Sequence, residues 1–231
     1  MPSDRTADLE FALAPRGRRR VWIEIVVAYV LILVVIWTPR PAQRWTWWIA
    51  AASVVFFTCI SFDGTQAMGL RAKNFLRSLW VAGAAVLIAA AAVFVAARLH
   101  TLHAPAGPMQ FIANYFAYAI WACAQQFLLE CYFLLRFLRL MPDRRWAALA
   151  SAGIFAAAHL PNPVLTPITL LWGVAACFLF LRYRNLYPLA LAHAILGITI
   201  SLTVPGPLDH NMRVGWSYLT YSPHVHHFHA R

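Results

Sequence analysis

Seven apolar segments occupy most of this chain, and they limit the folds that it can adopt. The segments lie at 21–37, 46–60, 80–97, 111–135, 146–160, 163–181 and 186–204. A helix that crosses a bilayer needs roughly 20 apolar residues, with a range of about 17 to 25, so the two shortest segments need flanking residues to span. We therefore expect an all-α, polytopic membrane protein with about seven transmembrane helices.

The composition excludes an ordinary soluble domain. Of the 231 residues, 61% are hydrophobic and only 12% are charged, whereas about 25% of a soluble domain is charged. The four cysteines all fall inside apolar segments and lack the spacing of a zinc site. We expect buried thiols rather than a disulfide framework.

The positive charges indicate a topology. If the N-terminus is cytoplasmic, five of the 19 Lys and Arg residues lie on the opposite side, namely Arg40, Arg44, Arg98, Arg213 and Arg231. Cytoplasmic loops carry an excess of Lys and Arg, so we predict a multi-pass protein of the cell inner (plasma) membrane with its N-terminus inside and its C-terminus outside. The net charge of +11 then reflects topology and attraction to the lipid bilayer. No nucleic acid is expected as a partner, because no soluble basic face is predicted.

The chain divides into four parts. We expect residues 1–20 to be an Arg-rich cytoplasmic N-terminus without a cleavable signal peptide, and 21–98 to form three accessory transmembrane helices. In this accessory part only Glu24 stands out, near the cytoplasmic end of its helix, where we expect it to reach the interface. Residues 111–204 form a four-helix core, and 205–231 form an extracytoplasmic tail. The tail contains a His-rich tract at 224–229, a composition that can bind metal or simply be exposed.

Polar side chains within the core mark a candidate site. Gln126 and Glu130 are four residues apart and so share one helix face, while His159 and His193 lie in later apolar segments. An ionisable group at mid-bilayer costs at least about 2.5–3.5 kcal/mol and usually faces protein or trapped water. With a helical rise of about 1.5 Å per residue, all four side chains lie between about 9 and 20 Å from the cytoplasmic side. They could therefore meet within one bundle.

These residue types suit hydrolysis of a peptide bond without a covalent nucleophile. A carboxylate can activate water and pass the proton to a leaving amine, and an imidazole or amide can stabilise an oxyanion. His159, His193 and Glu130 could also hold a divalent metal such as zinc with one open position, and metal dependence stays open. Hydrogen bonds that merely join helices are the alternative.

Two of these residues lie in longer motifs. "FAAAH" ends at His159, and "HAILG" runs from His193 to Gly197. The sequence resembles the CPBP family, the CAAX proteases and bacteriocin-processing enzymes also called ABI, whose pattern is EExxxR, FxxxH and HxxxN or HxxxD. The resemblance covers about residues 113–204. It implies an intramembrane protease with its site in a four-helix core.

The first motif departs from the family pattern. Aligned with EExxxR, Gln125 and Gln126 replace both glutamates, and Glu130 replaces the arginine. In the family one glutamate is thought to activate the attacking water, which a glutamine cannot do. The hypothesis is that Glu130 is the base, that His159 holds the water and that His193 donates to the oxyanion. Gln126 would then orient them.

The sequence thus predicts an intramembrane peptidase of the CAAX/CPBP type that cleaves a membrane-associated peptide or protein by glutamate- and histidine-activated water. The double glutamine favours the alternative, a catalytically inactive CPBP-fold protein for binding or scaffolding. Three weaker alternatives are a cysteine mechanism at Cys123 or Cys131, haem between the two histidines, and a transporter. The haem interpretation requires both imidazoles at one iron, yet their expected depths differ by about 10 Å. Repeated broken helices, typical of transporters, are not evident.

Overall fold

The computed structural model describes residues 16–103, 105 and 107–222, and all regular secondary structure in these ranges is helical. A helix forms at each apolar segment, which confirms the all-α prediction. The long elements are α2 (Arg18–Trp37), α3 (Gln43–Ile60), α6 (Trp80–Arg98), α7 (Pro108–Phe127), η1 (Leu128–Leu134), α8 (Leu135–Leu140), α9 (Arg144–Ala157), α10 (Leu165–Tyr183) and α11 (Tyr187–Thr203). The short ones are α4 (Gly64–Ala67), α5 (Phe75–Ser78), α12 (Gly206–Asp209) and α13 (Gly215–Leu219).

The described residues include four helices that are long and apolar enough to cross a membrane. They are Arg18–Trp37, Phe75–Arg98, Pro108–Leu140 and Leu165–Tyr183. The protein is therefore a multi-pass membrane protein. Helix α11 is apolar and has 17 residues, at the lower limit for a helix that crosses the hydrocarbon core, and α9 has only 14, below that limit. Seven spans remain a prediction.

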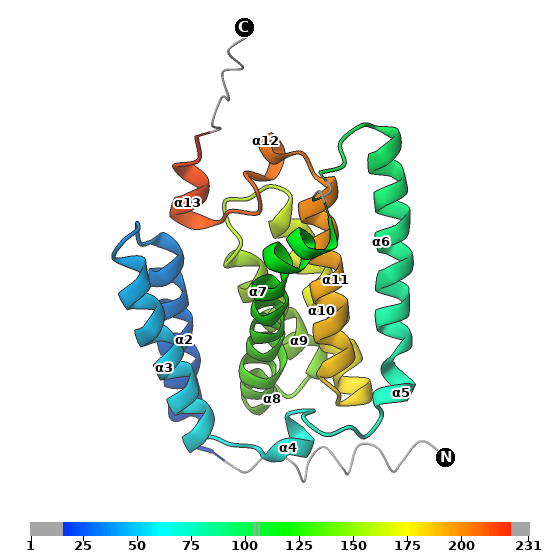
Figure 1. Ribbon diagram of the computed structural model, residues 1–231. Coiled ribbons are helices and arrows are strands. Elements are labelled where there is room, and N and C mark those ends of the chain that lie inside the picture. The colour runs from blue at the N-terminus through cyan, green and yellow to red at the C-terminus, as the bar shows by residue number, and fades with distance from the viewer. Residues whose placement is uncertain (1–15, 104, 106, 223–231) are drawn as a thin grey trace, which may run out of the picture.

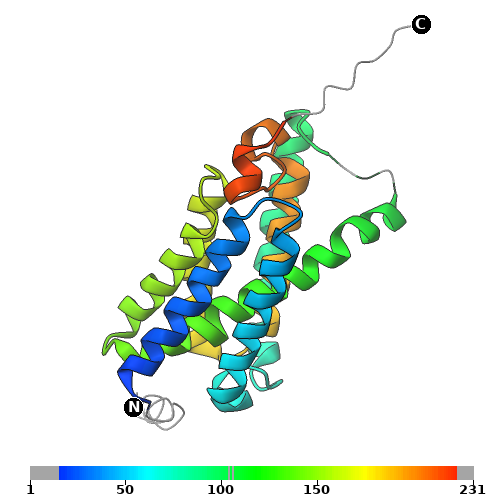
Figure 2. The same ribbon diagram turned by 90° about the vertical axis from the view of Figure 1, so that its left-hand side faces the viewer.

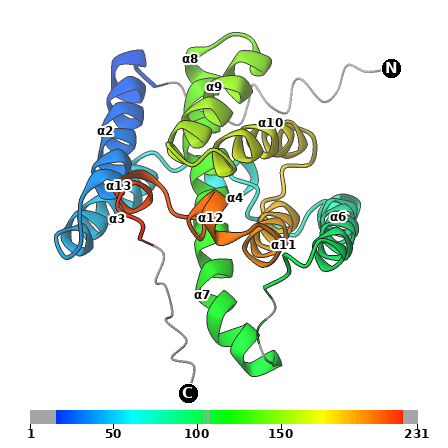
Figure 3. The same ribbon diagram turned by 90° about the horizontal axis from the view of Figure 1, so that it is seen from above.

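The long helices form three groups (Figure 1). The α2–α3 pair stands on one side and α6 on the other, with α7 to α11 between them. Figure 2 shows the α2–α3 pair from its own side, in front of the rest of the bundle. Seen from above, α11 lies between α6 and α7, and α10 lies beside α9 (Figure 3).

Loops predicted to share one side of the membrane do contact one another. At one end, the Asn185 side chain donates to the backbone oxygens of Arg71 (3.0 Å) and Lys73 (2.9 Å). At the other end, the Gly215 backbone N–H donates to the Leu160 carbonyl at 2.8 Å. The alternation of helices agrees with the predicted topology. Which end faces the cytoplasm stays a prediction.

The third long span contains a π-helix that the apolar pattern did not predict. Residues Leu128–Leu134 form η1 between α7 and α8, and every side chain from Leu129 to Leu134 is buried. A π-helix bonds residue i to i+5, is rare, and occurs often at functional sites. Because its wider turn changes the direction of the following side chains, it decides where Glu130 points.

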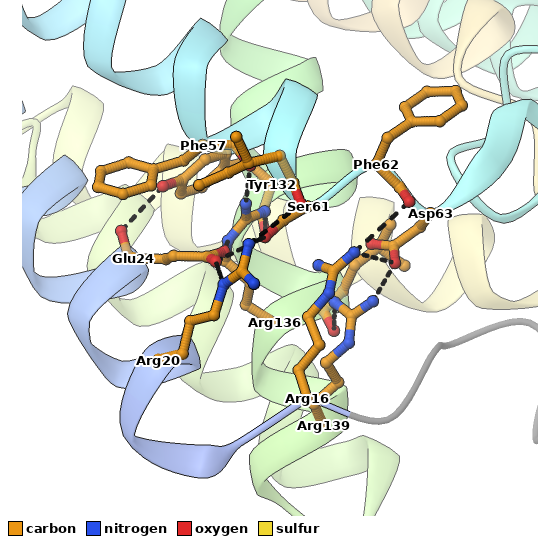
Figure 4. Close-up of polar contacts among 12 residues, drawn as sticks. Arg16, Arg20, Glu24, Phe57, Ser61, Phe62, Asp63, Tyr132, Arg136 and Arg139 are labelled. Carbon is orange, nitrogen blue, oxygen red and sulfur yellow. Dashed lines mark hydrogen bonds and ion pairs between the residues drawn. The ribbon is translucent and has the colours of Figure 1, made fainter.

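Glu24 does not reach the interface as expected, but lies in a buried ion pair (Figure 4). Its side chain is 1% exposed. One carboxylate oxygen accepts from Arg136 Nε at 2.9 Å, and the other accepts from Ser61 Oγ at 2.5 Å and Arg20 Nε at 3.0 Å. The Tyr132 hydroxyl donates to the Glu24 backbone oxygen at 2.8 Å. These contacts join α2 to the end of α3 and to the η1–α8 segment.

A second carboxylate beside this pair holds two more arginines (Figure 4). Asp63, just after α3, accepts from Arg139, and Arg16 Nη2 lies 3.4 Å from the same oxygen. Burial lowers the pKa of the Arg16 guanidinium. Through these arginines the two carboxylates connect the α2–α3 pair to α8.

The buried pair predicts a specific pattern of stability. Glu24→Gln should lower the free energy of unfolding by about 3 kcal/mol or more, because it leaves the Arg136 charge buried without a partner. The double variant Glu24→Gln with Arg136→Met should lose less, since no uncompensated charge remains. Thermal unfolding of the purified protein in detergent measures both.

Arg20→Ala is the matched control for this measurement. The Arg20 side chain is 49% exposed, and a pair of that kind contributes about 0–1 kcal/mol. A loss in Arg20→Ala as large as that in Glu24→Gln, or additive losses in the double variant, would contradict a buried pair.

Candidate active site

The side-chain amide of Gln126 connects three helical segments. Its Oε1 accepts from Trp172 Nε1 of α10 at 3.1 Å and lies 2.9 Å from His193 Nδ1 of α11. Its Nε2 donates to Glu130 Oε1 of η1 at 2.7 Å. Gln126 and Glu130 are fully buried, and His193 is nearly so. The residues around the amide therefore satisfy its hydrogen bonds without exposure to solvent.

The hydrogen bond from Trp172 determines the orientation of the Gln126 amide and, through it, the tautomer of His193. An indole N–H can only donate, so the Gln126 atom that faces it must be the carbonyl oxygen. His193 Nδ1 faces the same oxygen and must also donate a proton to it. In a neutral imidazole one nitrogen carries the proton and the other the lone pair. The lone pair of neutral His193 is therefore on Nε2.

His159 has the same tautomer as His193, but a backbone carbonyl fixes it. It lies in the turn after α9, where its Nδ1 is 2.8 Å from the Phe155 backbone oxygen. A carbonyl oxygen only accepts, so Nδ1 carries the proton and Nε2 the lone pair. The Phe155 ring contacts both imidazoles edge to face, with centroid distances of 4.9 Å to His159 and 6.0 Å to His193. The FxxxH motif thus places both histidines in contact with one phenyl ring.

Two buried asparagines begin the helices that carry this arrangement. Asn162 Oδ1 accepts from the Leu165 backbone N–H at 2.8 Å, at the start of α10. Asn185 Oδ1 accepts from the Tyr187 N–H at 3.1 Å, at the start of α11. A side-chain oxygen that accepts from the first free N–H groups stabilises a helix start. The positions of Trp172 and His193 along the bundle follow from these two starts.

A cavity of about 880 Å³ lies beside the two imidazoles. Its polar lining includes His159, His193, Gln125 and Tyr118, while most other lining side chains are apolar. Within the described ranges, no Asp, Glu, Lys or Arg side chain lines it. The cavity is within the size range of ligand sites, about 300–1,000 Å³, and resembles them in being largely apolar with a few polar groups.

Glu130 lies in the protein interior rather than at the cavity. Its side chain is 0% exposed, and it is absent from the cavity wall. Oε1 accepts from Gln126, and Oε2 has no hydrogen-bond partner among the described residues. The four predicted site residues are therefore neighbours, but the carboxyl reaches His193 only through the Gln126 amide. The sequence hypothesis placed Glu130 on the attacking water, and this geometry does not bring it there.

Sequence reasoning gave Gln125 no role, yet Gln125 lines the cavity and Gln126 does not. The motif alignment could have drawn attention to it, since Gln125 takes the place of the first family glutamate. Tyr118, eight residues before Gln126, also lines the cavity and carried no signal in the sequence.

The predicted metal ligands do not form a cluster. Over the described ranges, no group of three or more His, Cys, Asp and Glu side chains is arranged to hold a metal ion. His159, His193 and Glu130 are not gathered around one point, because Glu130 contacts the amide of Gln126. The His-rich tract at 224–229 lies outside the described residues.

The segment after α11 contributes to the cavity wall. Met212 and Val214 contribute to the cavity wall, and Asn162 Nδ2 donates to the Asp209 and Arg213 backbone oxygens at 2.7 and 3.0 Å. Burial raises the pKa of the Asp209 carboxyl. Residues 205–222 therefore pack against the bundle as a cap.

Comparison with known proteins agrees with the motif interpretation. Residues 124–199 match the Rce1-like family, described as type II CAAX prenyl endopeptidase Rce1-like. The match confirms the resemblance to CAAX proteases and includes both glutamines, Glu130, both histidines and Gly197. Neither a curated protein nor a solved structure matched the chain.

The amide geometry predicts the tautomer of each core histidine. In ¹⁵N NMR spectra of histidine-labelled protein, His159 and His193 should both be Nδ1–H tautomers. Trp172→Phe removes the donor that orients Gln126, so His193 alone should become a mixture of tautomers. Trp121→Phe is the control, because Trp121 also lines the cavity, whereas the indole that bonds Gln126 is that of Trp172. An Nε2–H tautomer for His193 in the unchanged protein would contradict the geometry.

Proposed function

We propose that this protein is an intramembrane peptidase that hydrolyses a peptide bond in a membrane-associated substrate. One observation carries the proposal: two imidazoles with their protons fixed on Nδ1 line one apolar cavity. The match of residues 124–199 to Rce1-like endopeptidases supports the reaction class.

His193 is the proposed base. Its Nε2 lone pair takes a proton from water as the water oxygen attacks the carbonyl carbon, and the proton then passes to the leaving amine. Gln126 Oε1 accepts from Nδ1–H and stabilises the imidazolium that forms. A base oriented by a third group in this way is a recurrent arrangement in hydrolases. His159, which lines the same cavity, positions the water.

Glu130 has a positioning role in this proposal. Its carboxyl accepts from the Gln126 amide and so directs the amide oxygen toward His193. Glu130 is not proposed as the base, because it does not line the cavity.

The cavity wall favours a substrate with an apolar part. Side chains from α2 and α3, such as Ile32 and Val54, also line the cavity. Burial of apolar surface contributes roughly 25 cal/mol per Å², so an apolar segment or chain next to the scissile bond would supply most of the binding energy.

A second candidate is a binding protein without catalytic activity. Two observations favour it: glutamines replace both family glutamates, and the cavity wall carries no carboxylate within the described ranges. In that case the two histidines would affect ligand affinity alone.

Histidine variants test the proposed reaction. The purified protein in lipid nanodiscs should cleave members of a quenched fluorogenic peptide library with an attached acyl chain. His193→Ala should lower the cleavage rate by about 10²-fold or more, the usual contribution of a general base, and His159→Ala should also lower it. His100→Ala is the control, since His100 is exposed and outside the cavity wall. Full activity in His193→Ala would contradict the proposal, and binding without cleavage by the unchanged protein would favour the binding protein.

Glu130 variants separate a positioning role from a base. Glu130→Gln keeps an oxygen that can accept from Gln126, so the cleavage rate should stay within a few-fold. Glu130→Leu removes the acceptor and should lower the rate at least tenfold, with a change in the His193 tautomer in ¹⁵N spectra. If Glu130→Gln abolished cleavage while His193 kept its tautomer, Glu130 would be the base after all.

A further inference from the structure

Helices α7 and α11 face each other along a line of polar contacts. Gln126 meets His193 at 2.9 Å, and two turns further along α11 the Tyr115 hydroxyl lies 3.3 Å from Ser201 Oγ. Between these two contacts Tyr118 meets Gly197. A Cβ atom added to Gly197 would lie 1.7 Å from the Tyr118 hydroxyl oxygen. The hydroxyl therefore rests directly against the backbone of α11, in space that any other residue at 197 would fill.

The space beside Gly197 is where the side chain of the last residue of the third motif would lie. Gly197 is four residues after His193, where the HxxxN or HxxxD pattern carries a polar side chain. Here α11 contributes no side chain, and a polar group from α7 takes the place. Tyr118 lines the cavity together with His159, His193 and Gly197.

The Tyr118 hydroxyl has a proton to donate. Among the described residues it has no hydrogen-bond partner, whereas the hydroxyl of Tyr115 is paired with Ser201. A phenol O–H both donates and accepts, so this hydroxyl is free to donate a hydrogen bond to a ligand in the cavity.

The imidazoles cannot supply a donor to the cavity while they are neutral. The Nδ1 proton of His193 is used by Gln126, and that of His159 by the Phe155 carbonyl. Their Nε2 atoms only accept. An oxyanion in this cavity therefore needs a donor from another residue. Tyr118 of α7 contacts Gly197, which lies one helical turn after His193 along α11.

We propose that the Tyr118 hydroxyl donates a hydrogen bond to the carbonyl oxygen of the scissile peptide bond and to the oxyanion that forms from it, an assignment that rests on the proposed peptidase function. As the water oxygen bonds to the carbonyl carbon, the C=O π electrons move onto the oxygen, and the water proton goes to His193 Nε2. Tyr118 keeps its proton throughout. When the C–N bond breaks, the proton on His193 passes to the amine, which leaves a carboxylic acid and an amine.

Three variants and two measurements test this role. Tyr118→Phe removes only the hydroxyl, Gly197→Ala displaces it, and Tyr115→Phe is the matched control on the same helix. The first measurement is kcat and KM on a cleaved acylated peptide. The second is the dissociation constant of a palmitoylated tripeptide trifluoromethyl ketone, whose hydrate resembles the tetrahedral intermediate, against that of the corresponding alcohol. Fluorescence of the cavity tryptophans reports binding.

Tyr118→Phe should lower kcat by about 10²-fold, the usual effect of losing one oxyanion donor, with KM changed less than threefold. It should weaken ketone binding at least tenfold and leave alcohol binding unchanged. Gly197→Ala should act in the same direction, and Tyr115→Phe should change neither value. Equal losses in Tyr118→Phe and Tyr115→Phe, or a change in KM alone, would overturn the assignment.

The two measurements also separate this proposal from the proposed function. If the unchanged protein cleaves nothing but prefers the ketone, and Tyr118→Phe abolishes that preference, the peptidase proposal fails while Tyr118 remains a carbonyl contact. If the unchanged protein cleaves peptides but Tyr118→Phe cleaves them equally well, only the Tyr118 assignment fails. If the protein neither cleaves peptides nor distinguishes the ketone from the alcohol, both fail.

Discussion

The hydrogen bonds of one buried amide, Gln126, determine how the rest of the core is arranged. In a low-dielectric interior each polar group must find its partner in the protein, and partly satisfied networks are costly. The donor-only indole of Trp172 fixes the carbonyl side of the amide, which fixes the tautomer of His193. The other side of the amide holds the carboxyl of Glu130. The π-helix that begins at Leu128 brings the carboxyl inside the bundle, where it cannot reach the cavity.

The altered first motif is consistent with this geometry. EExxxR places a carboxylate and a guanidinium four residues apart, where they can pair on one helix face. Here the amide at Gln126 donates and the carboxylate at Glu130 accepts, so the contact is kept with donor and acceptor exchanged. As a result, no negative charge remains at positions 125 and 126, where the family motif has two glutamates. Proton transfer, if the protein is a peptidase, must then use the imidazoles.

Hydropathy predicted where each long helix would form, because burial in lipid or protein selects apolar residues over a whole segment. The spacing of Gln126, Glu130, His159 and His193 predicted that they would be neighbours, and they are. The same reasoning could not say which side chain faces the cavity, since one extra residue in a π turn changes the direction of every side chain after it. Nor could it find the pair of Glu24 with Arg136, which are far apart in sequence, or Tyr118, whose role depends on the missing side chain of Gly197.

The central claim is that His193, held by Gln126, accepts the proton during the reaction. It is tested most directly by ¹⁵N NMR of histidine-labelled protein before and after addition of the trifluoromethyl ketone, with His193 assigned from a His193→Gln variant. We expect Nε2 of His193 to change from unprotonated to protonated when the ketone is bound as a tetrahedral adduct, while Nδ1 stays protonated. A spectrum in which His193 Nε2 remains unprotonated on the bound adduct would contradict the claim.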